Sequence, residues 1–220
     1  VVADGTLTAT GMGPVTVVAE QAGNDLYEPA SVTKTFNRPV VLPDKAELLG
    51  QWPPYPNGSA LGVEVQGTVA YVVLGGAGLQ VYDVSNPAAV VRVGGFDTPG
   101  YAVSVAVSGT RAYVADGSAG VHVIDVSDPA APVIRGTVAT GGDAKVVKVS
   151  GETVYVAAGS EGLVIVDASN ASEPKVAGKF KTNGSAVDVD VTGTMALVVD
   201  DDWALGGVHV VDVSEADRKS

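Results

Sequence analysis

Short apolar runs, separated by glycines and small polar residues, fill most of the chain. Between residues 100 and 126 it reads G-Y-A-V-S-V-A-V-S-G-T-R-A-Y-V-A-D-G-S-A-G-V-H-V-I-D-V. Val103–Val107 and Val187–Val191 alternate apolar and other residues, which is the period of a half-buried strand. Val, Ile and Tyr dominate the runs, while Gly, Ser, Asn, Asp and Pro bound them, as in strands joined by turns. The pattern predicts an all-β protein.

The runs recur with a fixed period. A turn glycine before each second run recurs in steps of 42 residues, at Gly67, Gly109, Gly151 and Gly193. The aspartate that ends each third run recurs in steps of 42, 42 and 45 residues, at Asp83, Asp125, Asp167 and Asp212. The last step is longer because Asp200–Leu205 stands where the other units have a short glycine-rich turn. Such a period, made of four short strands per unit, is typical of the blades of a β-propeller.

The turns have residues that suit them. Gly67, Gly109, Gly151 and Gly193 lie in hairpin connections, where glycine adopts a positive φ at no steric cost. The segments Asp83–Pro87 and Asp125–Pro129 follow a third run. Their Asp, Ser and Asn side chains can bond nearby backbone amides, and proline cannot continue a strand ladder. Each unit is therefore predicted to be a separate sheet.

Leu163-Val164-Ile165-Val166-Asp167 resembles the signature of the LVIVD-repeat family, and Leu79–Asp83, Val121–Asp125 and Val208–Asp212 are variants of it. The resemblance covers roughly residues 45 to 214. It implies a β-propeller of four LVIVD-type, four-stranded blades over residues 46–214. It also implies a bacterial protein that is secreted or held at the cell surface, without an enzymatic activity common to the family.

Residues 1–38 form a different unit, with strands expected at Thr6–Thr10, Val15–Glu20 and Val32–Asn37. The phrase T-G-M-G-P-V-T-V-V-A-E-Q-A-G-N-D-L-Y-E-P-A is similar to the closing half of a bacterial immunoglobulin-like module. Such a sandwich has about seven strands, so we expect a partial module. Its open β edges offer a route to self-association. A linker at 39–45 follows.

Ala46–Trp52 aligns in phase with the fourth strand of a blade, such as Val133–Val138. Val208–Val213 is a third strand, and the polar tail 215–220 supplies no fourth. The strand count balances if residues 46–52 complete the last blade and close a four-bladed ring. The alternative is that these blades belong to a larger propeller.

Composition narrows the range of partners. The net charge of −12 argues against nucleic acid and anionic membranes, both of which attract clustered Lys and Arg. No run approaches the about 18 apolar residues that a membrane helix needs. The absence of cysteine excludes disulfides and thiolate chemistry. With the β repeats, this composition favours an extracellular or cell-surface location.

The first strand of each blade is expected to line the propeller axis, where the charged candidates are Glu64, Lys148, Asp188 and Asp190. In a closed ring, Lys148 would meet Glu64 and Asp190. The arrangement would form either a small cation-binding mouth or, as we expect, a charge-balanced plug.

The insertion carries Asp200, Asp201 and Asp202, which are the candidates for a calcium site because hard cations take carboxylate oxygens. Their spacing is not that of an EF-hand, and a solvated acidic loop is the simpler interpretation. Trp203 beside them is an interaction candidate, as are Trp52 and Tyr55 in the segment W-P-P-Y-P.

His122 and His209 occupy one repeat position, which is filled by Gln80 and Val164 in the other units. We interpret both as residues of a strand face, because a catalytic role would not recur at a position also filled by valine. No catalytic residue and no cofactor other than calcium is predicted.

The sequence thus predicts a non-enzymatic scaffold that binds proteins or glycans, as a piece of a large repetitive adhesin or a subunit of a fibre or surface layer. The alternatives are a propeller hydrolase or lyase with its site at the channel mouth, and a calcium-stabilised adhesin.

Overall fold

A computed structural model gives the fold and describes residues 15–21, 30–36, 48–49, 58–202 and 206–214. The chain divides into two units, Val1–Leu48 and Leu49–Ser220. In the first unit β1 (Val15–Gln21) and β2 (Ala30–Phe36) pair antiparallel, with Val15 opposite Phe36. Two of the three strands expected there are thus confirmed. The third, Thr6–Thr10, lies outside the described residues, as do the linker 39–45 and the tail 215–220.

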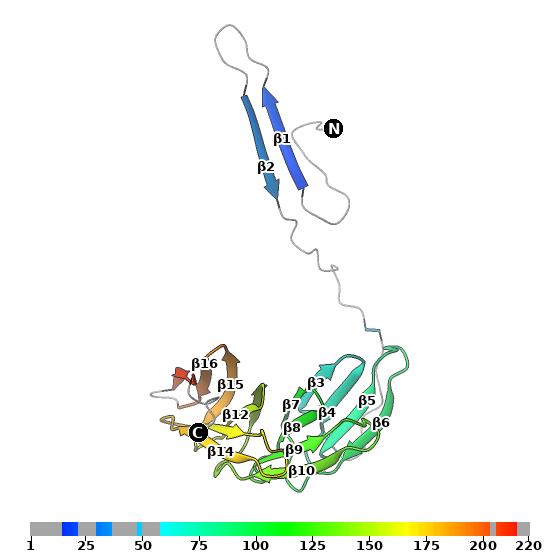
Figure 1. The fold of residues 1–220 in the computed structure, drawn as a ribbon, viewed down its shortest axis with the longest axis vertical. Coiled ribbons are helices and arrows are strands. Elements are labelled where there is room, and N and C mark those ends of the chain that lie inside the picture. Colours follow the sequence, from blue (N-terminus) through cyan, green and yellow to red (C-terminus); the bar gives the residue numbers. More distant parts are fainter. Residues whose placement is uncertain (1–14, 22–29, 37–47, 50–57, 203–205, 215–220) are drawn as a thin grey trace. The chain divides into compact units, whose positions relative to one another are not determined.

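The second unit is a succession of antiparallel sheets, which we call blades 1 to 4 (Figure 1). Blade 1 contains β3 (Gly62–Gln66), β4 (Val69–Val73), β5 (Leu79–Asp83) and β6 (Val91–Phe96). Blade 2 contains β7 (Ser104–Ser108), β8 (Arg111–Ala115), β9 (Val121–Asp125) and β10 (Val133–Val138). Blade 3 contains β11 (Val146–Ser150), β12 (Thr153–Ala157), β13 (Leu163–Asp167) and β14 (Lys175–Phe180). Blade 4 contains β15 (Ala186–Thr192), β16 (Met195–Asp200) and β17 (Gly207–Asp212). The predicted all-β fold is confirmed.

Both kinds of predicted turn are present. The hairpin glycines have φ between 57° and 62°, at Gly67, Gly109, Gly151 and Gly193. The aspartate at the end of each third strand accepts a hydrogen bond from the backbone N–H two residues on, at 2.8 to 2.9 Å, in Asp83, Asp125, Asp167 and Asp212. This bond stops the strand and stabilises the charged carboxylate, so the pKa of Asp83 and of Asp212 lies below its usual value.

Each blade is tied to the next by a short main-chain bridge. A glycine in the turn between the second and third strands exchanges two N–H···O=C bonds with an alanine at the start of the next blade. The lengths are 2.9 to 3.2 Å in the pairs Gly75–Ala102, Gly117–Ala144 and Gly159–Ala186. The first strands β3, β7, β11 and β15 contact one another in that order.

Apolar clusters fill the space between neighbouring blades, and each blade therefore has two different faces. The leading face packs on the next blade in the chain, and the receiving face packs on the previous one. In blade 1 the leading face consists of Tyr71, Val73, Leu79 and Val81, which pack on Val105, Ala112, Val114 and Ile124 of blade 2. The same repeat positions meet between blades 2 and 3 and between blades 3 and 4.

Blade 4 has three strands among the described residues. Leu48 and Leu49, two residues of the expected closing strand 46–52, are exposed and belong to no strand. The rest of that segment lies outside the described residues. No helix of the described part is long and apolar enough to cross a membrane.

A glycine in each complete fourth strand is the most direct test of blade-to-blade packing. Gly136 lies at a bulge of β10, and a Cβ there would overlap the carbonyl oxygen of Ala171 in blade 3. Gly136→Ala should lower the free energy of unfolding by about 1–3 kcal/mol, since the neighbouring backbone must shift.

Gly178 is the equivalent position of blade 3 and serves as the matched control. There an added Cβ meets only the Ile165 side chain, at 3.8 Å, among the described residues. Gly178→Ala should leave the urea midpoint nearly unchanged. Equal losses in the two variants would show that the close contact to blade 3 is not what requires glycine.

Candidate functional site

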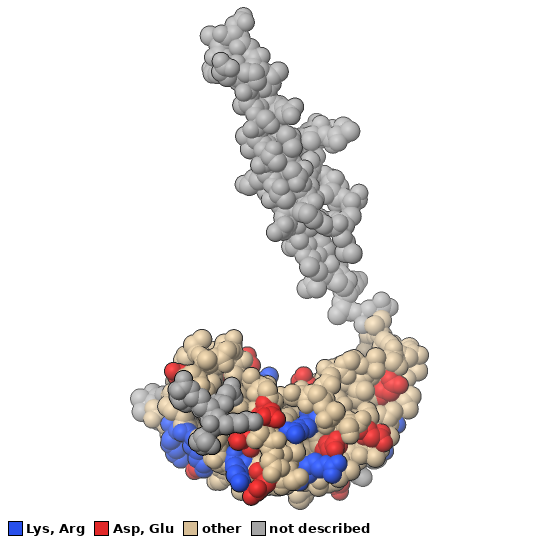
Figure 2. Space-filling model, viewed as in Figure 1, with Lys and Arg blue, Asp and Glu red and all other residues tan. Residues whose placement is uncertain are grey.

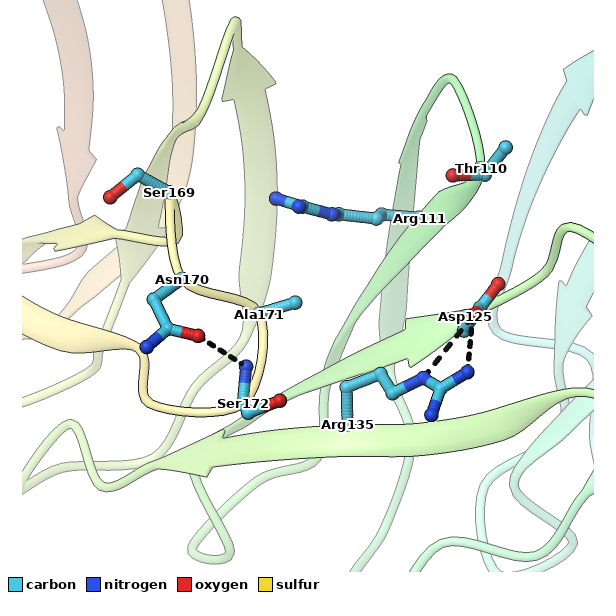
Figure 3. A pocket seen from close by; sticks show the side chains of 8 residues that line it. All are labelled: Thr110, Arg111, Asp125, Arg135, Ser169, Asn170, Ala171 and Ser172. Atoms are coloured by element: carbon cyan, nitrogen blue, oxygen red, sulfur yellow. Dashed lines mark hydrogen bonds and ion pairs between the residues drawn. The ribbon is translucent and has the colours of Figure 1, made fainter.

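A pocket of about 450 Å³ opens between blades 2 and 3 (Figure 3). Blade 2 contributes residues at the start of β8, at the end of β9 and within β10, and blade 3 contributes the loop after β13. The lining residues are Thr110, Arg111, Asp125, Arg135, Ser169, Asn170, Ala171 and Ser172.

The two arginines of the pocket have different partners. Arg135 donates to Asp125 Oδ2 from Nε at 3.1 Å and from Nη2 at 2.7 Å. The backbone N–H of Ser127 and then Arg135 lower the pKa of Asp125, so this carboxylate stays charged. Arg111 crosses to blade 3, where its Nη1 donates to the carbonyl oxygen of Ala168 at 2.9 Å. Within the described part of the chain, its Nε and Nη2 groups have no protein acceptor.

These arginines interrupt the repeat. The positions equivalent to Arg111 hold Val69, Thr153 and Met195, and those equivalent to Arg135 hold Val93 and Ala177. Blade 2 alone therefore places two cations here, on a chain that is strongly acidic overall. The reasoning from sequence missed both, although a comparison of equivalent repeat positions would have singled them out.

Elsewhere on the described surface, charged side chains of opposite sign form ion pairs. Acidic and basic side chains are interspersed over the blades (Figure 2). One such pairing joins Lys179 to Glu161 at 2.8 Å, and it holds the pKa of Glu161 below its usual value. The pocket differs from this pairing in that one of its cations, Arg111, forms no ion pair with a carboxylate among the described residues and donates instead to the carbonyl oxygen of Ala168.

His122 belongs to a buried polar network. Its Nε2 lies 2.8 Å from Asp116 Oδ2 and its Nδ1 lies 2.9 Å from Thr137 Oγ1. Asp116 also accepts bonds from the Thr98 hydroxyl and from the backbone N–H of Gly100, each at 2.7 Å. Both His122 and Asp116 are buried. The network ties the segment between blades 1 and 2 to the turn of blade 2, as expected for a structural histidine.

Blade 4 repeats this pair with Asp200 and His209, in which His209 Nε2 lies 3.6 Å from Asp200 Oδ2. Asp200 is buried, and its carboxylate accepts bonds from the backbone N–H groups of Gly184 and Asp202 at 2.8 and 2.9 Å. The bond from Gly184 is the main reason that the pKa of Asp200 is low. Asp201 turns to the backbone N–H of Ser185, at 3.2 Å.

Among the described residues, the three calcium candidates do not form a group that could hold a metal ion. Asp200 and Asp201 hold neighbouring backbone amides, and the described residues contain no group of three or more His, Asp or Glu side chains placed to hold a metal ion. The interaction candidates Trp203, Trp52 and Tyr55 lie outside the described residues.

The predicted channel residues lie on first strands, as expected. Glu64 is on β3, Lys148 on β11, and Asp188 and Asp190 on β15, and all four are exposed. Among the described residues, no ion pair joins Lys148 to Glu64 or to Asp190. Their mutual neutralisation was predicted for a closed ring and stays a prediction.

Four antiparallel sheets, joined in chain order through their first strands, define a protein of the β-propeller class. The computationally designed protein Ika4 is similar over 77% of this chain and 100% of its own, with a TM-score of 0.61 and 8% identity. The designed protein Ika8 is similar over 72% of this chain and 47% of its own, with a TM-score of 0.59 and 7% identity. Sqt1 of Saccharomyces cerevisiae is similar over 65% of this chain and 42% of its own, with a TM-score of 0.55 and 10% identity. The chain thus spans less than half of the last two, and the likeness concerns the fold alone.

The LVIVD repeat model matches residues 57–98, 99–140 and 141–182, which together make up more than half of the chain. The chain belongs to the LVIVD-repeat family. The three matches coincide with blades 1 to 3, and the fourth unit that the repeat period predicted is the three-stranded blade 4. No curated protein matches the sequence.

The buried Asp116–His122 pair can be tested against blade 3, which has Ala158 and Val164 at the same positions. Asp116→Ala should lower the free energy of unfolding by about 3–5 kcal/mol, because it leaves buried donors without an acceptor. His122→Val should be less damaging, since the other bonds to Asp116 remain.

The double variant Asp116→Ala/His122→Val reproduces the apolar solution of blade 3. Its loss in urea unfolding should be smaller than the sum of the single losses by more than about 1 kcal/mol. Simple additivity would mean that the two side chains do not act as a pair.

Proposed function

We propose that this protein is a non-enzymatic binding scaffold, and that the pocket between blades 2 and 3 holds a carboxylate of its partner. The observation that carries the proposal is Arg111, which is half-buried and anchored by one N–H group on Ala168. A guanidinium held in this way presents its other N–H groups in a fixed fork that matches a carboxylate. Asn170 and the serine hydroxyls beside it add neutral hydrogen-bonding groups.

The same chemistry favours binding over catalysis. Arginine stays protonated in proteins, so neither Arg111 nor Arg135 can exchange a proton with a substrate. Asp125 is held in its charged form by Ser127 and Arg135, far from the pKa of a useful general base at neutral pH. The pocket therefore suits recognition of an acidic side chain of a protein or of an acidic sugar of a glycan.

The proposed location is extracellular, at a bacterial cell surface. Support comes from the cysteine-free composition and the net charge of −12, which keeps a protein soluble and monodisperse. Residues 1–38 are proposed to be a partial immunoglobulin-like module that associates through its open strand edges, and the β1–β2 pair supports this proposal. A place in an adhesin, fibre or surface layer is proposed on the same features.

Binding can be tested with two probes, a peptide of four glutamates with blocked ends and an oligosaccharide that contains glucuronate. Arg111→Thr, which installs the residue of blade 3, should weaken binding of the responding probe at least about tenfold, because a charge-assisted bond is lost. Titration followed by NMR shifts of the pocket backbone would measure the effect.

Lys175→Thr is the control, since it removes one positive charge from an exposed side chain outside the pocket. It should change the affinity only slightly, and added salt should weaken binding of both proteins. The proposal fails if neither probe shifts the pocket signals, or if Lys175→Thr weakens binding as much as Arg111→Thr.

A further inference from the structure

The two ends of the row of blades present the two kinds of face that pack together between consecutive blades of the chain. Three interfaces within the chain bring a leading face against a receiving face, with the same repeat positions each time. Blade 4 has a leading face and blade 1 has a receiving face, and neither has a described blade beside it. The exposed fractions of equivalent residues show which contacts are missing at each end.

On blade 4 the leading face is apolar and open to solvent. Val208 is 60% exposed and Val210 is 66% exposed. The residues equivalent to Val208 in blades 1 to 3 are completely buried, and those equivalent to Val210 are at most 9% exposed. Val199 and Met195 on the neighbouring strand β16 are exposed as well. This face has the apolar residues of an interface between blades, but no described blade packs on it.

On blade 1 the exposed part of the receiving face is its first strand. Val63 is 61% exposed, whereas its equivalents Val105, Val147 and Val189 are at most 6% exposed. Val65, on the same face, is 54% exposed. The outer part of this face, at Ala70 and Val72, is already buried. The uncovered strip therefore lies along β3, which is where the first strand of a preceding blade would pack.

We propose that a second copy of the chain supplies both covers. The leading face of blade 4 docks on the receiving face of blade 1 in the partner copy, and the reciprocal contact closes a ring of two copies. An open surface of this kind on a soluble protein marks an interaction site. The match of repeat positions identifies the complementary end face as its occupant, since that pairing is already made three times within each chain.

The acidic residues near this face do not oppose the docking. Asp190 lies on β15 at the position of Glu64 and Lys148. Both of those side chains remain exposed although their blades are packed on a neighbour, whereas the smaller Ala106 at the same position of blade 2 is buried. Asp190 can therefore stay in water after association. Asp188 already accepts a bond from the backbone N–H of Val189, at 2.8 Å.

The arrangement of these blades also occurs in a longer chain. The blades overlay all of Ika4 and 47% of Ika8 at TM-scores of 0.61 and 0.59. The same arrangement of blades therefore occurs in a chain that continues well past the length of this row. In a ring with further blades, the leading face of blade 4 needs a receiving face beside it, and blade 1 of the partner copy would supply that face.

The oligomeric state of the full chain is the first test. Sedimentation equilibrium should give a dimer, and Val210→Lys or Val63→Lys should each raise its dissociation constant at least about tenfold, because each buries a charge in an apolar contact. Val133→Lys is the control, since this valine is also exposed but lies on the fourth strand of blade 2. A wild-type monomer at every concentration, or a dimer that only Val210→Lys weakens, would overturn the proposal.

Crosslinking then identifies the surfaces in contact. Between blades 1 and 2 the Gln66 side chain donates to the carbonyl oxygen of Gly109, at 3.0 Å and next to Thr110. The equivalent positions at the two ends are Thr192 and Thr68, which are exposed. Because the chain has no cysteine, Thr68→Cys and Thr192→Cys give a clean pair for a short bis-maleimide.

A mixture of the two single variants should crosslink at the mass of a dimer, and neither variant alone should do so. A chain that carries both substitutions and crosslinks within itself, at the mass of a monomer, would show that the ring closes in one chain and would contradict the proposal. Absence of any crosslink between the mixed variants would do the same. Association through residues 1–38 would give no crosslink in the mixture. It would also leave the dissociation constants of Val210→Lys and Val63→Lys equal to that of the control Val133→Lys.

Discussion

The bridge between a turn glycine and the alanine of the next blade is the contact on which the rest of the second unit depends. It fixes the first strand of each blade against its neighbour by two main-chain hydrogen bonds, and these need no particular side chain. Gly75, Gly117 and Gly159 all have a left-handed φ there, between 54° and 62°. Once the bridge has set the distance between two blades, Val, Ala and Tyr side chains of ordinary size fill the space. The repeat can therefore vary in sequence while the spacing of the blades is kept.

The same pair of repeat positions holds chemically different residues in different blades. Blade 2 fills the space behind the turn with Asp116, His122 and their hydrogen-bond partners, whereas blade 3 has Ala158 and Val164 there. A buried polar pair is tolerated only when its bonds are complete, and an apolar pair must fill the same volume. Both blades keep the neighbouring chain segment in place. The polar version adds a specific connection to Thr98 and Gly100 in the segment that leads into the blade.

Local chemistry was readable from the sequence, and contacts between blades were not. The hairpin glycines and strand-ending aspartates follow from rules that involve at most five neighbouring residues, so their turns and the order of the strands were predicted. The bond from Arg111 to Ala168 joins residues 57 positions apart, across two sheets. Nothing in the sequence around Arg111 shows that partner. For the same reason, the sequence did not show that Thr98 and His122 both form hydrogen bonds with Asp116.

The strict reuse of repeat positions has a consequence for how such chains change over evolutionary time. Every interface between blades joins the same leading positions to the same receiving positions, so the gain or loss of one complete unit leaves the chemistry of each remaining interface as it was. Stability in such arrays depends mainly on neighbouring units. Changes in length by whole multiples of the repeat are therefore the least disruptive, and an insertion inside a unit, such as the one after Asp200, must be accommodated within a single turn.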